Sequence, residues 1–337
     1  MVEKIKIETL SKIFSGLSLK KKFEKYRRLW EQAAKYEVLT DFPLHLDIEL
    51  AGVCNLRCDF CFQNDLITKP LGLMDMDMYT KIIDEGKRSG LCAIKLQIRG
   101  ESFLHPRLFD CICYAKDAGI MDVQITTNGT LLNEERITDI LNSGLDKIVF
   151  SVDDHHSAAY GKRNTDPCYF STKYAISHLL RQKKKLGKSK PVVHVQANIS
   201  DVDIESVKRI QLYLQKEFLE PDKIIINRLH DYRNEVDSFR DIDKDYQMPP
   251  CSYLVQRLAV FWNGEVTTCC MDYNNIFKLG NAKQKTIKEI WQSETMETLR
   301  EKHFEGQYGD VPVCKHCYVS SGLYKDVGNG IVDRNFS

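Results

Sequence analysis

Strand-type runs and helix-period segments alternate along most of this 337-residue chain. The apolar, β-rich runs are His45–Leu50, Ala93–Ile98, Val123–Thr126, Ile148–Val152, Val192–Ile199 and Ile224–Ile226. The helix-period segments between them are Met78–Arg88, Pro106–Ala118, Asn133–Ser143, Tyr169–Lys185 and Ile204–Phe218. This alternation predicts an α/β fold with a parallel sheet covered by helices. The order alone does not distinguish a doubly wound sheet from a barrel.

Three cysteines follow the first of these strands closely. Cys54, Cys58 and Cys61 form a C-x3-C-x2-C run. Three thiolates this close can hold three irons of a [4Fe–4S] cube, which takes four ligands, so one iron is left open for a ligand that is not protein. The alternatives are a zinc knuckle or three buried thiols. A structural zinc site usually has four protein ligands, and His45, upstream, is too distant in sequence to be the fourth.

A second group of cysteines lies near the C-terminus. Cys251, Cys269, Cys314 and Cys317 follow one another at separations of 18, 45 and 3 residues. An Asn263-Gly264 pair predicts a hairpin turn between the first two. Four thiolates complete either a [4Fe–4S] cluster or a tetrahedral zinc site, and the number of ligands does not decide between them. Adjacent to Cys269, Cys270 is a rival ligand.

Composition limits the environment and the partners. The formal net charge is +1, so we expect no general attraction to nucleic acid or to an anionic membrane. No apolar run approaches the roughly 18 residues that a membrane span needs. The first twelve residues are charged and lack the apolar core of a signal peptide. Cysteines grouped at metal-ligand spacing in a chain of this size indicate metal binding in a reducing cytoplasm.

The pattern divides the chain into four parts. Residues 1–43 form an N-terminal helical extension, whose basic, amphipathic stretch we expect to pack on the main domain rather than to act as a binding arm. Residues 44–230 carry the alternating strands and helices. Residues 231–250 are predicted to form a linker. Residues 251–337 form a small C-terminal module, with a further helix expected at Ile287–Lys302.

The first cysteine run resembles the signature of the radical S-adenosylmethionine (SAM) enzymes, in which SAM chelates the open iron. That resemblance implies an open, partial (β/α)6 TIM-like barrel with its site at the carboxyl ends of the strands. The C-terminal pattern resembles the shortened SPASM, or twitch, module, which carries one auxiliary [4Fe–4S] cluster. The matching stretches are Cys251, Gly264-x4-Cys269, Leu279-Gly280-Asn281, Ile290-Trp291 and Cys314-x2-Cys317. The G-x4-C spacing favours Cys269 over Cys270 as a ligand.

The resemblance also implies cofactors and site residues. The cofactors are SAM and two [4Fe–4S] clusters, one SAM-binding and one auxiliary. The run Arg99-Gly100-Glu101-Ser102 resembles the G-G-E-P motif that meets the SAM ammonium group, but Arg99 replaces the first glycine and Ser102 the proline. By this resemblance the positions expected at the SAM site are Phe60, Gly100, Glu101, Ser102, Asn128, Ser151, Asp153 and Arg163. Asn198, a polar residue late in the apolar fifth strand, is a further candidate.

For the reaction, the four-cysteine pattern resembles the 2-deoxy-scyllo-inosamine dehydrogenase branch. It implies two-electron oxidation of a carbohydrate-like or aminocyclitol alcohol, with a reducing partner such as flavodoxin or ferredoxin. Alternatives are a peptide-modifying SPASM maturase, a radical epimerase with a cysteine hydrogen donor, and a non-catalytic zinc-binding module. The thiols without an assigned role are Cys92, Cys111, Cys113, Cys168 and Cys270. No catalytic acid or base is identifiable from the pattern.

Overall fold

The structure is a computed structural model that describes residues 6–58, 61–67, 71–152, 167–199, 204–218, 220–228, 250–307, 309, 311–314 and 317. The chain divides into two compact units. The first comprises Met1–Asn55, Phe62–Val123 and Val236–Leu323. The second comprises Leu56–Cys61, Gln124–Glu235 and Tyr324–Ser337.

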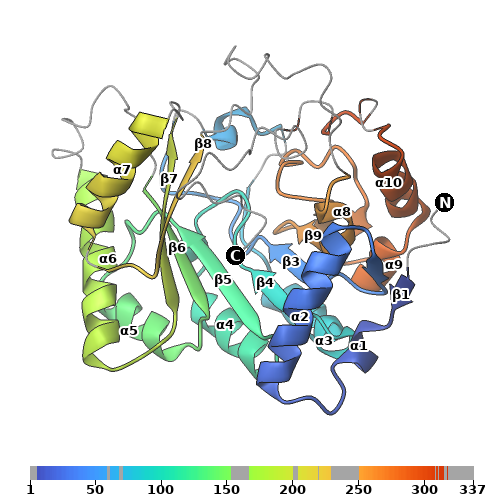
Figure 1. The fold of residues 1–337 in the computed structure, drawn as a ribbon, viewed down its shortest axis with the longest axis horizontal. Helices are drawn as coiled ribbons and strands as arrows, with labels where there is room; N and C mark the ends of the chain where they lie inside the picture. The colour runs from blue at the N-terminus through green and yellow to red at the C-terminus, as the bar shows by residue number, and fades with distance from the viewer. Residues whose placement is uncertain are drawn as a thin grey trace. The chain divides into compact units, whose positions relative to one another are not determined.

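The first unit combines elements from both ends of the chain (Figure 1). Its N-terminal elements are β1 (Lys6–Glu8), α1 (Leu10–Ile13), α2 (Leu19–Ala34), β2 (Val38–Thr40), β3 (His45–Ile48), η2 (Phe62–Asp65), α3 (Met76–Ser89), β4 (Ala93–Lys95), η3 (Ser102–Leu104) and α4 (Leu108–Asp117). Its C-terminal elements are α8 (Tyr253–Gln256), β9 (Arg257–Val260), β10 (Glu265–Thr267), β11 (Gly280–Asn281), α9 (Ile287–Trp291) and α10 (Glu294–Phe304).

Five strands of this unit lie side by side in the order β11-β10-β9-β3-β4. Strand β3 pairs in parallel with β4, where His45 lies opposite Ala93, and with β9, where His45 lies opposite Arg257. Strands β9 and β10 form the antiparallel hairpin that Asn263-Gly264 predicts. Gly264 has a φ of +88° there, a conformation that glycine adopts without steric cost. The C-terminal hairpin thus continues the same sheet as β3, which the sequence pattern did not indicate.

Helix α2 packs on the C-terminal segment of the first unit. Its buried residues are Tyr26, Leu29, Trp30 and Ala33. The carbonyl oxygen of Trp30 accepts a hydrogen bond from Gln256 Nε2 at 2.8 Å, and the Arg257 guanidinium lies 5.1 Å from the centre of the Trp30 ring. Just after the helix, the Tyr36 hydroxyl donates to the carbonyl oxygen of Cys251 at 2.8 Å. The basic N-terminal stretch therefore forms a helix whose contacts here are to the C-terminal segment. The first 43 residues also contribute the strands β1 and β2, which the sequence pattern did not indicate.

Parallel strands and their connecting helices build the second unit. Strand β5 (Asp122–Thr127) begins in the first unit and continues into the second. It is followed by α5 (Glu134–Asn142), β6 (Lys147–Ser151), α6 (Pro167–Lys185), β7 (Val192–Ile199), α7 (Ile204–Glu217) and β8 (Lys223–Arg228). The strands are neighbours in the order β5-β6-β7-β8, and every pair is parallel.

One face of this sheet is apolar. Ile148 and Phe150 on β6 and Val193 and Val195 on β7 are each fully buried. Side chains alternate between the two faces of a strand, so these four share one face. Helices α5, α6 and α7 lie along one side of β6, β7 and β8 (Figure 1). We assign the apolar face to that helical cover, which leaves the opposite face for polar side chains.

The predicted strands are confirmed as β3 to β8 and the helices between them as α3 to α7, with ends that differ by at most three residues. The helix expected at Ile287–Lys302 is two helices, α9 and α10, because Ser293 caps a new start by accepting from the Met296 amide at 3.4 Å. Residues 231–249 of the predicted linker lie outside the described residues. In the part of the chain that the structure describes, no helix has the length and apolarity to span a membrane.

Candidate functional site

The segment that leads from β3 to Cys54 is held by backbone hydrogen bonds to residues 72–74, around an isolated bridge between Ala51 and Leu73. Gly52 donates its amide to Gly72 O at 2.9 Å, and the Leu50 carbonyl accepts from the Met74 amide at 2.8 Å. A side chain at Gly52 would approach the Trp262 ring to 2.8 Å, closer than such contacts normally come. Cys54 follows, half-buried. Cys54, the first predicted iron ligand, thus directly follows a segment that backbone hydrogen bonds hold in place.

The loop after β4 packs directly against that segment. A Cβ at Gly100 would overlap the carbonyl oxygens of Ala51 and Val53. The Glu101 amide donates to Val53 O at 2.9 Å. In the first unit, the Gly100-Glu101 motif and the segment leading to Cys54 are therefore joined backbone to backbone at the carboxyl ends of neighbouring strands, where barrels of this type place their sites.

We expect Gly100→Ala to destabilise the protein and to weaken SAM binding. The new methyl group meets backbone on both sides, so the loops must separate, and such overpacking typically costs about 1–3 kcal/mol of unfolding free energy. Because Val53 precedes Cys54, the separation also displaces the first cysteine. Urea unfolding of the metal-free protein and SAM titration of the reconstituted protein measure the two effects.

Gly309→Ala is the matched control, because nothing lies within 4 Å of a Cβ at that position. It should leave both measurements at the wild-type values. An unfolding midpoint for Gly100→Ala equal to that of Gly309→Ala would contradict the close packing of the two loops.

A buried ion pair joins Glu49, which directly follows β3, to Arg99 in the loop after β4. Arg99 donates from Nη2 to Glu49 Oε2 at 2.6 Å and from Nε to Glu49 Oε1 at 2.7 Å. Glu49 is fully buried and Arg99 is 4% exposed. Glu49 also accepts from the Trp262 amide at 3.2 Å. Sequence reasoning left the contacts of Arg99 unassigned and missed Glu49, although an acidic residue at the end of an apolar strand was a usable signal.

The side chains of Glu101 and Ser102 are engaged locally. Glu101 is 2% exposed, and its Oε1 accepts from the Phe103 amide at 3.1 Å, which caps the short helix η3. The Ser102 hydroxyl donates to the carbonyl oxygen of Leu96. Both residues therefore shape the loop, and a contact of either with SAM stays a prediction.

The second unit contains the remaining residues predicted for the SAM site and its cluster that the structure describes. The Cys61 amide donates to Cys58 O at 2.9 Å, so these two cysteines lie on one tight turn. Asn128 Oδ1 accepts from the Thr130 amide at 2.9 Å, which forms a turn after β5. Ser151 ends β6. Phe60, Asp153 and Arg163 lie outside the described residues.

Asn198 has a buried partner that the sequence did not reveal. It lies opposite Asn227 in the β7–β8 register, and Asn227 Nδ2 donates to Asn198 Oδ1 at 3.3 Å. Asn227 is fully buried, and within the described residues its Oδ1 has no hydrogen-bond partner. Two amides thus share the polar face of the sheet at the carboxyl ends of these strands.

The auxiliary cysteines lie within electrostatic range of one another in the first unit. Burial, and secondarily the Cys317 thiol, raise the pKa of Cys251 to about 12. Burial also raises the pKa of Cys269 well above its usual value, and the thiols of Cys270, Cys251, Cys317 and Cys314 raise it further. Metal ligation requires the thiolate form of these cysteines. Thiolates this close repel one another, and a bound multivalent cation offsets that repulsion. The donor set therefore fits an iron–sulfur cluster.

Cys270 lies in a different environment from its neighbour. It packs against an apolar cluster of Ile98, Ala259 and Phe261. Cys269 lies within electrostatic range of Cys270 and of all three remaining auxiliary cysteines. The choice of Cys269 over Cys270 as the ligand stays a prediction from the G-x4-C spacing. No disulfide joins any of the twelve cysteines, all of which the structure describes, and within the described residues no three Cys, His, Asp or Glu side chains converge on one ion position.

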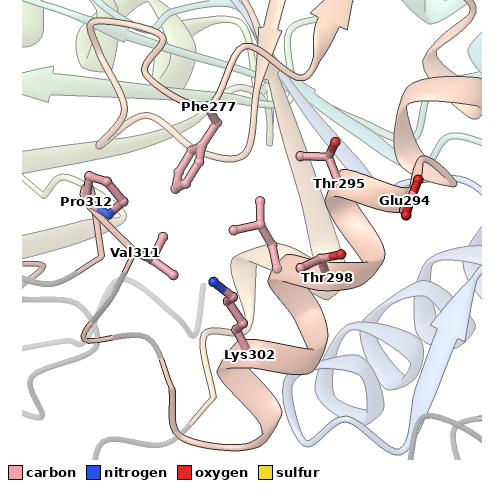
Figure 2. A pocket seen from close by; sticks show the side chains of 8 residues that line it. Phe277, Glu294, Thr295, Thr298, Lys302, Val311 and Pro312 are labelled. Atoms are coloured by element: carbon pink, nitrogen blue, oxygen red, sulfur yellow. The ribbon is translucent and has the colours of Figure 1, made fainter.

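The C-terminal segment also has an open hollow of about 400 Å³ beside α10. Its lining residues are Phe277, Glu294, Thr295, Thr298, Leu299, Lys302, Val311 and Pro312. Figure 2 shows Phe277 and Lys302 projecting into it from different sides. The lining contains no cysteine and no residue of the strand ends, so we do not assign it to the cofactor site.

Comparison with protein families agrees with this arrangement. A model of the radical SAM superfamily matches residues 48–208, and a model of the SPASM iron–sulfur cluster-binding domain matches residues 251–318. This chain is a radical SAM enzyme with a SPASM domain. Its cofactors are SAM and [4Fe–4S] clusters.

Curated relatives of this radical SAM enzyme differ in the reactions their names describe. The tungsten-containing aldehyde ferredoxin oxidoreductase cofactor-modifying protein of Pyrococcus furiosus is 25% identical over 298 residues, which cover 76% of this chain and 83% of the relative. A GTP 3′,8-cyclase of Parasynechococcus marenigrum is 32% identical over 117 residues, 32% of this chain and 33% of the relative. The chain thus spans only about a third of that cyclase.

Solved structures establish the fold as a partial barrel of the radical SAM type. BtrN in complex with AdoMet and 2-DOIA has a TM-score of 0.56 at 16% identity, with 87% of this chain and 96% of BtrN covered. SuiB of Streptococcus suis bound to the precursor peptide SuiA has a TM-score of 0.57 at 15% identity, with coverages of 82% and 70%. The ligands of these neighbours are a small molecule in one and a peptide in the other.

Proposed function

We propose that this radical SAM enzyme catalyses the two-electron oxidation of an alcohol group on a carbohydrate-like or aminocyclitol small molecule. The observation that carries the proposal is the pair of cysteine sets. Cys54, Cys58 and Cys61 leave one iron of a cluster open, whereas Cys251, Cys269, Cys314 and Cys317 fill a second one. When bound, SAM and the clusters supply a carbon-centred radical for hydrogen abstraction and an acceptor for the remaining electron.

The residues of the chain position these groups. In this proposal the segment leading to Cys54, packed on Gly100 and Glu101, holds the SAM site, and Cys269 with its partners holds the auxiliary cluster. Phe60, Ser102, Asn128, Ser151, Asp153, Arg163 and Asn198 remain proposed SAM contacts. The positioning of donor and acceptor is the contribution that a protein makes to cofactor chemistry of this kind.

The polar face of the β5–β8 sheet supports a substrate rich in neutral polar groups. Ser151 lies opposite Gln196, and Asn198 lies opposite Asn227. These hydroxyl and amide groups are uncharged and can both donate and accept hydrogen bonds, as hydroxyl and amino substituents of a sugar-like ring require. Lys147 and Lys223 of this face lie nearer the amino-terminal ends of the strands, and so does His194. Burial, and then the two lysines, lower the pKa of His194 to about 4, so it is neutral near pH 7.

Deuterium transfer tests the proposed reaction. Anaerobically reconstituted enzyme is supplied with SAM, a reductant and polyols or aminocyclitols deuterated at each carbinol carbon. We expect deuterium in 5′-deoxyadenosine and one carbonyl product for each SAM consumed. SAM cleavage without deuterium transfer from any of these alcohols would contradict an alcohol substrate.

A second candidate function is modification of the organic cofactor of a metalloenzyme. It is favoured by the Pyrococcus furiosus relative, because that match covers 76% of this chain. The same assay separates the two functions. Deuterium transfer from a labelled cofactor of a tungsten enzyme, with none from the alcohols, would establish the second function in place of the first.

A further inference from the structure

The loop that carries Cys269 contacts the segment that follows Cys61. Tyr273 stacks on Phe62, with ring centres 4.8 Å apart and an interplanar angle of 21°. One residue along, Asn274 Oδ1 accepts from the Ile67 amide at 3.0 Å. Phe62 directly follows Cys61 in the chain. Two loops that are about 200 residues apart in sequence, each bearing or adjoining cluster cysteines, therefore meet in the first unit.

Arg99 adds a third connection between these parts of the unit. Its Nη1 donates to the Tyr273 carbonyl at 3.0 Å while its other nitrogens bind Glu49. Its guanidinium lies 3.8 Å from the centre of the Phe261 ring, and its own carbonyl accepts from Gln63 Nε2 at 2.7 Å. Arg99, which stands in place of the first glycine of the G-G-E-P pattern, thus connects the SAM motif to the cysteine loop of the SPASM domain.

The Cys269–Asn275 loop is built to be rigid. Asp272 is 1% exposed and accepts from the Ile276 amide at 2.7 Å and the Phe277 amide at 3.1 Å. It also accepts from the Thr267 hydroxyl. The Asn275 amide donates to the Asp272 carbonyl at 3.0 Å. These hydrogen bonds fix the centre of the loop that links Cys269 to Tyr273 and Asn274.

We propose that the Cys269–Asn275 loop is a clamp on Phe62–Ile67 and Arg99, through which occupancy of the auxiliary cluster stabilises the segment next to the SAM-binding cluster. The clamp rests on the proposed ligation of the auxiliary cluster by Cys269. Tyr273 and Arg99 are positioning residues in it. Since coupling is reciprocal, the segment after Cys61 also stabilises the auxiliary loop.

Hydrogen–deuterium exchange of the reconstituted protein tests the contact itself. The Ile67 amide reports directly, since Asn274 protects it. Loss of an aromatic pair should raise exchange in residues 62–67 about tenfold in Tyr273→Ala, and Tyr273→Phe, which keeps the ring, should retain protection. Faster exchange confined to residues 270–276 would overturn the clamp. If Tyr273→Ala does not fold, Asn274→Ala removes only the hydrogen bond, and we expect a rise of about fivefold at Ile67.

A double-mutant cycle on the reconstituted protein tests the coupling to the cluster. Cys269→Ala should raise exchange in residues 62–67, and Cys270→Ala should not. In the Tyr273→Ala background the effect of Cys269→Ala on this segment should disappear, because the connection is already broken. An equal effect of Cys269→Ala in both backgrounds would overturn the proposal. Exchange and iron content are measured without substrate, so a failure of the alcohol-oxidation proposal leaves these results interpretable.

Discussion

Cys58→Ala should abolish reductive cleavage of SAM. The proposed SAM-binding cluster has only three protein ligands, so the loss of one leaves two thiolates for a cube that takes four ligands in all. Cys58 shares a tight turn with Cys61, which leaves no neighbouring thiol to replace it on that turn. We expect no 5′-deoxyadenosine above background, and iron falling from about eight per chain to about four, the content of one cube.

The auxiliary cluster should survive this substitution. Its four proposed ligands are far from Cys58 in sequence, and its signal should remain visible by EPR after reduction. Cys113→Ala is the matched control, because Cys113 is exposed on α4 and belongs to neither cysteine set. It should keep both the iron content and SAM cleavage. Production of 5′-deoxyadenosine by Cys58→Ala at the wild-type rate would refute the assignment of the first cluster.

Periodicity and cysteine spacing were strong guides to the fold of this chain. Each predicted strand from His45–Leu50 to Ile224–Ile226 corresponds to an observed strand. The reason is that a short apolar run bounded by turn residues is typical of a buried strand. The resemblance of the cysteine runs to radical SAM and SPASM enzymes is confirmed by the family models. Local signals of this kind need no knowledge of the tertiary structure.

Contacts between distant segments were not predictable in the same way. The pairing of β9 with β3 joins residues more than 200 positions apart, and no local pattern specifies such a partner. The buried pair of Glu49 with Arg99 has the same origin. From sequence alone, a charged residue in a cofactor-binding motif is normally predicted to contact the ligand. The fold shows instead that Arg99 binds a carboxylate and a backbone carbonyl of its own chain.

Local hydrogen bonds explain why individual site residues were harder to predict than the motifs. Ser102 and Asn128 bond to nearby backbone groups, which short polar side chains do readily in turns. Their spacing within the motifs therefore serves the shape of the loops as well as any contact with SAM. Asn227 carried no motif at all, and only its register opposite Asn198 brings it to the polar face.

Cys269→Ala and Cys270→Ala should have opposite consequences for the auxiliary cluster, although the two residues are adjacent. The G-x4-C spacing assigns Cys269 to the cluster, and Cys269 lies within electrostatic range of Cys251, Cys314 and Cys317. Cys270 packs against an apolar cluster. We therefore expect Cys269→Ala to reduce iron from about eight to about four per chain, while Cys270→Ala keeps about eight. Anaerobic reconstitution with iron and sulfide, followed by metal analysis and EPR, measures both.

The same pair of variants separates the chemistry of the two clusters. Cys269→Ala should still form 5′-deoxyadenosine, because the first cysteine set is intact, but it should lose the oxidised product, because the electron left on the substrate has no acceptor. Cys270→Ala should keep both activities. Iron lost in Cys270→Ala and retained in Cys269→Ala would transfer the ligand assignment to Cys270. A wild-type content of about four irons with zinc as the remainder would replace the auxiliary cluster with a tetrahedral zinc site.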